Sequence, residues 1–161
     1  MEQRFERIYA EHREAVRAYV RRRAPEAVVD DEVSETFVVC LRKIDRVPPE
    51  PLPWLYAVAR KTLANERRKR ARVAPSEVRL VVEPEPVGGG ALAAAFNRLS
   101  EKDREVLRLV AWEGLSLTDA ATVLGCSGVA CRVRYHRAKS RLASQLEAAA
   151  SFRPKPKEVT R

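Results

Sequence analysis

The sequence predicts an all-α protein, with two small helical domains joined by a flexible linker. Apolar residues recur at helical spacing on both sides of the middle of the chain. Between them, Pro75, Pro84, Pro86 and three consecutive glycines make a regular helix improbable. Helix start and stop signals then follow in order through the second half. The expected boundaries are 1–72 and 91–150 for the domains, 73–90 for the linker and 151–161 for a disordered tail.

Composition restricts the function classes. The 161 residues and 45% hydrophobic content suffice for one medium domain or two small ones. A net charge of +9 favours nucleic acid or an anionic membrane as partner. No apolar run approaches the roughly 20 residues that span a bilayer, so stable membrane insertion is not expected. The chain has three widely spaced cysteines, and this odd number favours reduced thiols over a disulfide framework. We therefore expect a cytoplasmic protein.

The first expected helix, within residues 5–20, has one apolar face. An arc of about 120° holds its larger apolar side chains, which is typical of a helix packed on others. His12 lies in the middle of that face and is interpreted as a packed core histidine. The face consists of Phe5, Ile8, Tyr9, His12, Val16, Tyr19 and Val20.

The second expected helix is DDEVSETFVVCLRKI, residues 30–44. Helical spacing predicts a buried stripe on one side of it and a mixed face on the other. Val38 stands among the charges of the mixed face, where a simple solvent-facing surface has no need of a valine. Contact with another protein and ordinary surface fit this pattern about equally. The stripe is Val33, Phe37, Cys40, Leu41 and Ile44, and the mixed face is Asp31, Glu35, Val38 and Arg42.

The third expected helix is PLPWLYAVARKTLANERRKRAR, residues 51–72. From Arg60 to Arg72 there are seven basic residues against one acid, Glu66. An outward Trp54 followed by such a basic track suits single-stranded DNA, because aromatic rings stack on unpaired bases and cations follow phosphates. Packing of Trp54 against a neighbouring loop fits as well. The inward residues are Leu52, Leu55, Tyr56, Ala59 and Leu63, and the outward ones are Trp54, Val58, Lys61, Asn65 and Arg68.

The second half contains the parts of a helix-turn-helix. LSEKDREVLRLVAWEG, residues 99–114, begins with a capping box of Ser100 and Asp103 and has Val106, Leu107, Val110 and Ala111 as its apolar face. SLTDAATVLG, residues 116–125, begins with a second capping box and ends at Gly125. Ser127 is then placed to cap a basic helix, the position of the helix that enters the DNA major groove.

The residues of the basic helix, 128–142, distinguish between two kinds of site, one that binds a metal ion and one that binds an acidic partner. Helical geometry points Cys131 and His136 about 140° apart, which argues against a shared metal, and besides these two and Cys126 no fourth candidate ligand lies nearby. Cys131 instead joins a core stripe with Tyr135, Ala138 and Leu142. The opposite face has no acid between residues 128 and 142 and therefore predicts a polyanion as partner. Its residues are Val129, Arg132, Val133, His136, Arg137 and Ser140.

Together these segments resemble the extracytoplasmic-function (group 4) sigma factors of bacterial RNA polymerase. DDEVSETFVVCLRK is similar to the family's region 2.2 and PWLYAVARKTLANERRKR to regions 2.3 and 2.4. Residues 91–142 are similar to region 4. The resemblance implies a promoter-specificity subunit that binds core RNA polymerase and recognises and helps melt promoter DNA. It implies no cofactor, no metal and no catalytic residue, because the polymerase supplies the chemistry.

The resemblance also implies roles for particular residues. The mixed face of the second helix would dock on the clamp helices of the polymerase beta-prime subunit, and the C-terminal domain would meet the beta flap. The turn from Ile44 to Pro51 would capture a flipped base of the −10 element. An anti-sigma factor is a further implied partner. The assignments are Asp31, Glu35, Val38 and Arg42 for polymerase; Trp54, Arg60, Lys61, Asn65 and Arg68 for the −10 element and melting; and Arg132, Val133, His136 and Arg137 for the −35 element.

Two departures from the family pattern lie in the second expected helix. Glu32 stands where the family usually has leucine and Ser34 where it has glutamine.

Two other functions compete with a sigma factor. One is a stand-alone helix-turn-helix regulator with an N-terminal dimerisation or sensing domain, which the outward basic track disfavours. The other is an enzyme, which the missing Gly-rich phosphate loop and the explained histidines disfavour.

Overall fold

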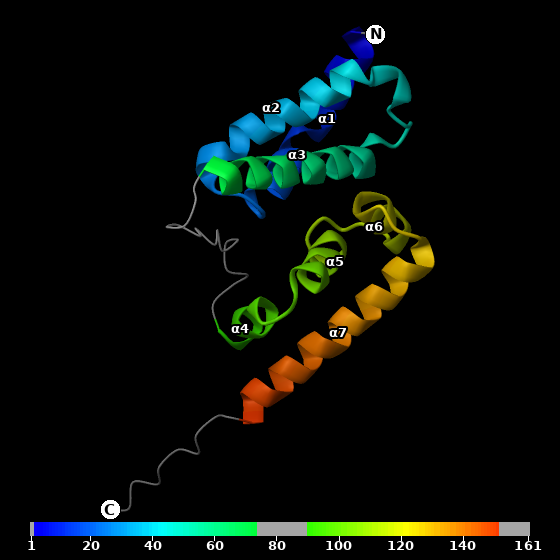
Figure 1. Cartoon of the computed structure of the whole chain (residues 1–161). Helices are drawn as coiled ribbons and strands as arrows, with labels where there is room; N and C mark the ends of the chain where they lie inside the picture. The colour runs from blue at the N-terminus through cyan, green and yellow to red at the C-terminus, as the bar shows by residue number, and fades with distance from the viewer. Residues whose placement is uncertain (1, 74–89, 152–161) are drawn as a thin grey trace, which may run out of the picture.

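The computed structural model describes residues 2–73 and 90–151 of the chain. Within these ranges all regular structure is helical, which confirms the predicted fold class (Figure 1). The N-terminal bundle comprises α1 (Glu2–Arg21), α2 (Glu26–Arg42), the short 3₁₀ helix η1 (Ile44–Arg46) and α3 (Pro51–Val73). The C-terminal bundle comprises α4 (Ala91–Asn97), α5 (Glu101–Ala111), α6 (Leu117–Leu124) and α7 (Gly128–Ser151).

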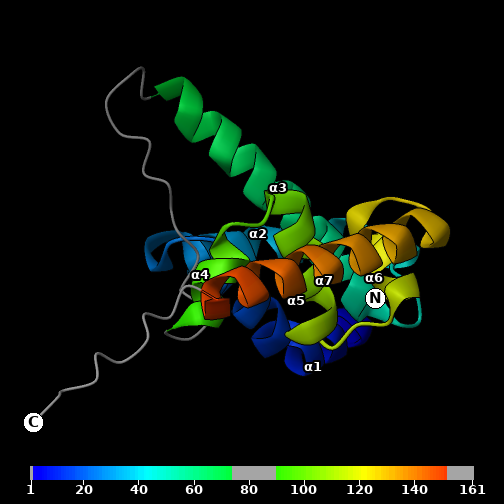
Figure 2. The ribbon, with the colours of Figure 1, turned by 90° about the horizontal axis from the view of Figure 1, so that it is seen from below.

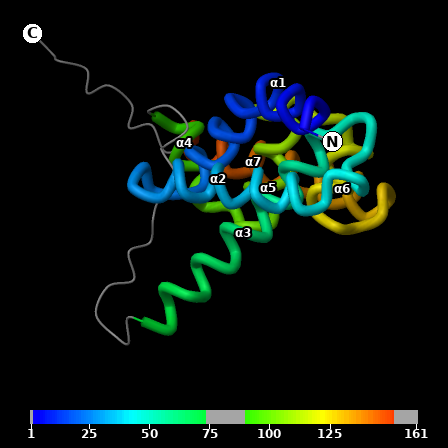
Figure 3. The backbone as a smooth tube through the Cα atoms, turned by 90° about the horizontal axis from the view of Figure 1, so that it is seen from above, coloured from blue at the N-terminus to red at the C-terminus, as the bar shows by residue number. Residues whose placement is uncertain are grey.

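The N-terminal bundle forms because three amphipathic helices pack their apolar faces together. Helix α1 contacts both α2 and α3, and α2 also contacts α3 (Figures 1 and 3). Tyr19 lies fully buried at the centre, with its ring stacked on that of Tyr56 at a centroid distance of 4.7 Å. Around this pair are the buried side chains Ile8, Val16, Val20, Val29, Val33, Phe37, Cys40, Leu55, Ala59 and Leu63.

The predicted start and stop signals of the C-terminal bundle are present. The Ser100 hydroxyl accepts a hydrogen bond from the Asp103 backbone N–H at 3.2 Å and begins α5. The Ser116 hydroxyl accepts one from the Asp119 N–H at 3.0 Å and begins α6. Gly125 ends α6 with φ of +65°, a left-handed conformation that favours glycine. These caps fix the turn that leads into α7.

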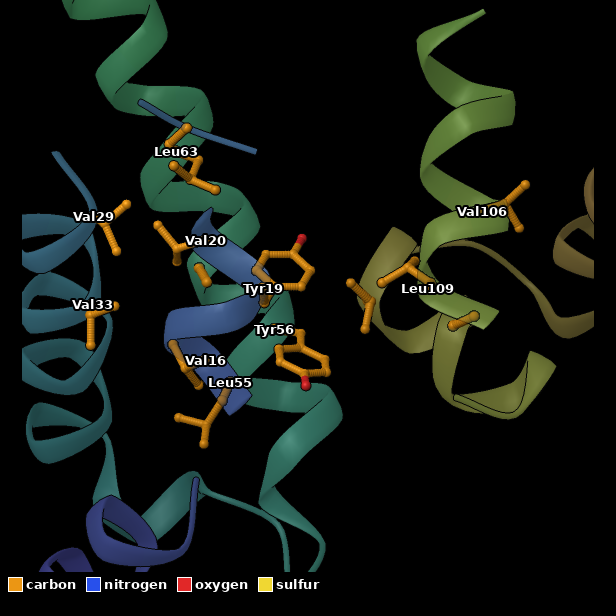
Figure 4. Close-up of a cluster of buried hydrophobic side chains, with 14 of the residues drawn as sticks. Val16, Tyr19, Val20, Val29, Val33, Leu55, Tyr56, Leu63, Val106 and Leu109 are labelled. Atoms are coloured by element: carbon orange, nitrogen blue, oxygen red, sulfur yellow. The ribbon is translucent and has the colours of Figure 1, made fainter. Parts of the chain in front are cut away.

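The two bundles pack against each other in one continuous core. Helix α3 contacts α6, and Leu109 of α5 lies across from Tyr19 and Tyr56 (Figure 4). Figures 1 and 2 together place α7 on the side of α5 that faces away from the N-terminal bundle. Leu109 and Val106 are fully buried. The contact between the bundles was not part of the sequence prediction.

Three expected core positions are exposed. Tyr9 is 39% exposed, although its ring still meets the Phe37 ring edge-on at 4.8 Å. Leu41, at the border of the α2 stripe, is 48% exposed. Ala111 lies at the open end of α5 and is also exposed. The predicted apolar faces were therefore too wide at their edges.

Parts of the predicted layout lie outside the described residues. The expected linker falls largely within 74–89 and the expected tail within 152–161, and the structure does not describe either range.

His12 is half-buried on α1, with 3.8 Å between its Nε2 and a carboxylate oxygen of Glu11. Among the described helices, none combines the length and apolar character needed to cross a bilayer.

Candidate nucleic-acid interface

Helix α7 presents the basic face that the sequence predicts. Its first turn is capped by the Ser127 hydroxyl, which accepts a hydrogen bond from the Ala130 N–H at 3.2 Å. Cys131 and Ala138 are fully buried against the rest of the bundle, so the opposite side of the helix must face outward. The exposed residues of that side are Val129, Arg132, Val133, His136, Arg137 and Ser140.

The outward side of α7 borders a groove that reaches the start of α5. Val133, Arg134 and Arg137 line it from α7, and Ser100 and Lys102 line it from α5. Helix N-termini and cations both attract phosphate groups. The groove therefore combines side chains that can read base edges with groups that can hold the DNA backbone.

Arg141 differs from its neighbours on α7. Its guanidinium donates to a carboxylate oxygen of Asp103 at 2.6 Å, and the Asp103 side chain is only 5% exposed. The pair ties the basic part of α7 to the capped first turn of α5. The sequence pattern does not reveal this contact.

The two cysteines near the turn lie in the bundle. Cys131 is fully buried and Cys126 is half-buried. Burial raises the pKa of the Cys131 thiol, and the neighbouring Cys126 adds to the effect. His136 lies on the exposed side of α7, with its ring 5.8 Å from that of Tyr135. The cysteines and the histidine thus lie on different faces of the helix.

Helix α3 carries a second cationic face. Arg60, Lys61, Asn65 and Arg68 are exposed along it, and the Arg68 guanidinium donates to the Asn65 side-chain oxygen at 2.6 Å. Trp54 is half-buried, with part of its ring packed on the core and part open to solvent. The structure thus shows partial packing of Trp54, and its contact with single-stranded DNA stays a prediction.

The turn before α3 is fixed by a contact from α1 that the sequence does not signal. The Arg4 guanidinium donates to the carbonyl oxygens of Ile44, at 2.9 Å, and of Val47. Ile44 and Val47 are themselves buried, while Asp45 and Glu50 are exposed. Arg4 thus holds the loop between α2 and α3 against the bundle, and the exposed residues of the loop project beside the start of α3.

A third exposed face lies on α2. Asp31, Glu35 and Arg42 are exposed, and Val38 is 38% exposed among them. Leu41, which we expected in the core, adds a second apolar side chain beside Val38 and Arg42. An apolar pair surrounded by charges of both signs is a common composition for a protein-binding surface.

Glu32 is buried on the other side of α2. Its residue is 7% exposed, and the carboxylate oxygen Oε2 has no hydrogen-bond partner among the described residues. Burial raises the pKa of this carboxyl group, the polar side chain of Thr62 on α3 lowers it, and nearby Glu66 and Glu35 raise it further. A carboxyl group thus occupies a position between α2 and α3 that an apolar side chain would fill without this cost.

Comparison with known proteins assigns the two bundles to one family. Residues 8–73 match the family described as Sigma-70 region 2, and residues 89–142 match Sigma-70, region 4. The chain is 33% identical over 127 residues to the ECF RNA polymerase sigma factor EcfG of Rhodopseudomonas palustris, spanning 73% of this chain and 70% of that one. This chain belongs to the ECF RNA polymerase sigma factors. It is a promoter-recognising sigma subunit of RNA polymerase.

Solved structures of sigma factors share the fold. CnrH, solved in complex with the cytosolic domain of CnrY, is 28% identical with a TM-score of 0.64, and the match covers 92% of this chain and 90% of that chain. RpoE of Bartonella quintana, solved with the anti-sigma factor NepR, is 24% identical with a TM-score of 0.65, and the match covers 89% of this chain and 96% of that chain. The second likeness concerns the fold alone.

Proposed function

We propose that the three exposed faces of this sigma factor have separate tasks in initiation. The face of α7, with Arg132, Val133, His136 and Arg137, reads the −35 element in its major groove. The single observation that carries this assignment is the division of α7 into a buried stripe and an exposed face without acid. Arginine fits guanine because its guanidinium can donate two hydrogen bonds to the O6 and N7 acceptors.

The face of α3 and the loop before it bind the −10 element. Trp54, Arg60, Lys61, Asn65 and Arg68 lie beside the melted strand, and the exposed part of the 44–51 loop receives an unstacked base. Arg4 supports this task by holding the loop through two backbone carbonyls. An open aromatic edge next to exposed cations is the combination that single-stranded nucleic acid requires.

The face of α2 docks on the polymerase. Asp31, Glu35, Val38 and Arg42 contact the beta-prime clamp helices, and the C-terminal bundle contacts the beta flap. The polymerase supplies the chemistry and this chain supplies binding, so none of its residues has a catalytic role. The two functional domains in this proposal are residues 1–72 and 91–150. Residues 73–90 connect them, and residues 151–161 form a tail.

An anti-sigma factor is a further proposed partner. The solved relatives RpoE and CnrH were determined with NepR and with the cytosolic domain of CnrY, respectively. The exposed Val38 and Leu41 on α2 offer apolar contacts to such a protein as well as to polymerase. The two partners would then compete for the same face.

Charge reversal at Glu35 tests the docking face. Glu35 is exposed and points away from the buried side of α2, so Glu35→Lys leaves folding almost unchanged, within about 0.5 kcal/mol. At a desolvated contact the new like charge costs several kcal/mol of association. Transcription from a cognate promoter with reconstituted polymerase is therefore expected to collapse while helicity and melting temperature stay constant. Glu14→Lys, at an exposed site on α1, is the matched control and keeps activity.

The opposite result would favour a different assignment. A stand-alone regulator binds an intact duplex operator without polymerase and is indifferent to Glu35. Unchanged transcription by Glu35→Lys, with co-elution of the variant and core polymerase, would remove the docking role from this face of α2. The membership of the chain in the sigma family does not depend on that result.

A further inference from the structure

A small space between the two bundles is lined mainly by cations. It measures about 180 Å³ and is bounded by residues of α1, α3, α5, α6 and α7. Like charges at close range repel one another, so such a gathering is unfavourable unless an anion lies among them. Two carboxylates line the space against five cations, which are Arg23, Arg60, Arg67, Lys102 and Arg134.

Both carboxylates of the lining already have partners. Glu101 accepts a hydrogen bond from the Arg104 guanidinium at 2.8 Å. Glu105 accepts one from Nε of Arg23 at 2.9 Å and one from the Tyr19 hydroxyl at 3.3 Å. Among the described residues, neither carboxylate forms a hydrogen bond or an ion pair with the other four cations of the lining.

The charges of these four cations are therefore not balanced by an anion. Within the part of the chain that the structure describes, the side chains of Arg60, Lys102 and Arg134 form no hydrogen bond and no ion pair. The Arg67 side chain donates from Nη2 to the Arg23 carbonyl oxygen at 2.8 Å, and this acceptor is uncharged. Arg134 is half-buried, which makes an unbalanced charge less favourable than at a fully exposed site.

Arg23 adds an unsatisfied donor on the buried side of the space. Its side chain is only 4% exposed, and its Nε and Nη1 atoms donate to Glu105 and Glu113. Its Nη2 atom is buried and has no hydrogen-bond partner among the described residues. Buried donors without a partner are rare in folded proteins and are destabilising. Because Arg23 lines the space, a ligand there would supply the missing acceptor.

The size and the charge of the space indicate the class of ligand. Pockets for drug-sized molecules measure about 300–1,000 Å³, so a space of about 180 Å³ suits a smaller group. A carboxylate offers only two oxygens and a single charge, and it would leave most of the cations unpaired. A phosphate group matches the fork of an arginine with two parallel hydrogen bonds, and a diphosphate presents several such edges and charges.

We infer that this space binds a compact oligophosphate, of which inorganic diphosphate is the simplest. Arg67 of α3 and Arg134 of α7 hold it from the two bundles, and Arg23 meets it at the buried end. The same diphosphate group occurs in nucleoside diphosphates, whose sugar and base exceed the space and would lie outside it. This site is separate from the roles proposed for the DNA faces, although Arg60 belongs to both, and Arg60 is therefore left unchanged in the test.

Isothermal titration calorimetry of the full-length chain with inorganic diphosphate tests the site, without magnesium and in about 0.15 M chloride. We expect one diphosphate to bind per chain. Arg67→Gln/Arg134→Gln removes one charge-assisted contact from each bundle. Each loss should weaken binding about tenfold, so the dissociation constant of the double variant should rise about a hundredfold.

The matched control is Arg72→Gln/Arg132→Gln. It removes one exposed arginine from each of the same two helices, and neither residue lines the space. The control should keep the wild-type dissociation constant, because chloride at this concentration screens charges that do not contact the ligand. Equal losses in the two double variants, or several diphosphates per chain, would show general attraction to a basic protein and would overturn the site.

A lysine variant separates the contact from damage to the fold. Arg67→Lys/Arg134→Lys keeps both charges but loses the planar forks, so binding should weaken less than in the glutamine variant while helicity stays that of wild type. If the glutamine variant loses helicity, the lysine variant carries the test, and an unchanged dissociation constant in it would overturn the site.

Further titrations distinguish the sources of the phosphate group. If adenosine diphosphate binds more tightly than inorganic diphosphate and depends on Arg67 and Arg134, a nucleotide is the source; weaker binding identifies free diphosphate. A short single-stranded DNA without terminal phosphates that binds as tightly and depends on the same two arginines would place the space on the DNA path and overturn the inference. No polymerase enters these measurements, so their outcome is separate from that of Glu35→Lys.

Discussion

Helices α5 and α7 belong to the same C-terminal bundle, but their charged faces differ in exposure. The charged face of α7 is exposed, with Arg132, His136 and Arg137 all open to solvent. The charged face of α5 is buried, with Glu105 at 8% and Arg108 at 3% exposure. The difference arises because Tyr19 and Arg23 of the N-terminal bundle contact Glu105 of α5. Helix α7 packs its buried side, with Cys131 and Ala138, on the other C-terminal helices, and its opposite face is exposed.

Burial changes the electrostatics of the α5 face. Burial lowers the pKa of Arg108, and the nearby Arg23 lowers it further, while Glu101 and Glu105 oppose both effects. Such charges require specific partners, whereas the cations of α7 remain hydrated until a polyanion binds. A charged helix face can therefore bind either DNA or another part of the same chain. Which of the two it binds depends on whether another part of the chain covers it.

The largest effect should come from shortening a buried side chain of α5. Leu109 is fully buried at the contact between the bundles, and Leu109→Ala both loses apolar burial and leaves a cavity (Figure 4). We expect a loss of about 3 kcal/mol in the free energy of unfolding, measured by chemical denaturation. The matched change on α7 is Val129→Ala at a site that is 74% exposed, with an expected change below about 0.5 kcal/mol. Similar losses in both variants would contradict the contrast between the helices.

A smaller effect, confined to DNA binding, is expected on α7. Replacing Arg137 or Arg132 by alanine should cost about 1–3 kcal/mol at the preferred −35 element if the side chain is bidentate to guanine. The measurement is a titration of promoter DNA with holoenzyme at fixed salt, together with thermal unfolding of the free chain. Stability should stay constant because both arginines are exposed.

Arg141 supplies the control on the same helix. Arg141→Ala removes a cation near the DNA backbone and should weaken binding evenly across DNA sequences. It also leaves the buried Asp103 carboxylate without its 2.6 Å partner, so this variant alone should lose stability. Equal losses on all sequences for Arg132, Arg137 and Arg141 would show that the base-reading face is assigned wrongly.

The smallest effect is expected at Glu32, a buried carboxyl group within one bundle. Because its pKa is raised in the folded chain, folding favours the protonated form and stability falls as pH rises above the ordinary value of 4.5. Glu32→Gln should therefore raise the free energy of unfolding at pH 7 by about 1 kcal/mol. The gain should shrink as the pH is lowered toward 4.5, which denaturation curves at several pH values can measure. A less stable variant at pH 7 would mean that the polar surroundings of Glu32, including Thr62, outweigh the cost of burial.

Much of the fold and of the candidate interfaces was predictable from local patterns. Ser100, Ser116 and Gly125 mark helix ends through contacts within a few residues, and local chemistry is enough to foresee them. Periodicity identified the buried stripe around Cys131 and Ala138 and hence the exposed face of α7 opposite it. The edges of such stripes were less certain, since Tyr9 and Leu41 are exposed although their spacing is that of core residues.

The contacts that join distant segments depend on tertiary structure. Arg4 reaches the carbonyls of Ile44 and Val47 across about forty residues of chain, and Arg23 reaches Glu105 across 82. No pattern along the sequence records such distances, and the charges involved are of types that usually remain in water. By itself, then, the sequence determined the helices, their caps, their apolar faces and the family, because these depend on neighbours along the chain. Tertiary structure alone decided which charged faces stay open, because a face is buried only when another part of the chain covers it.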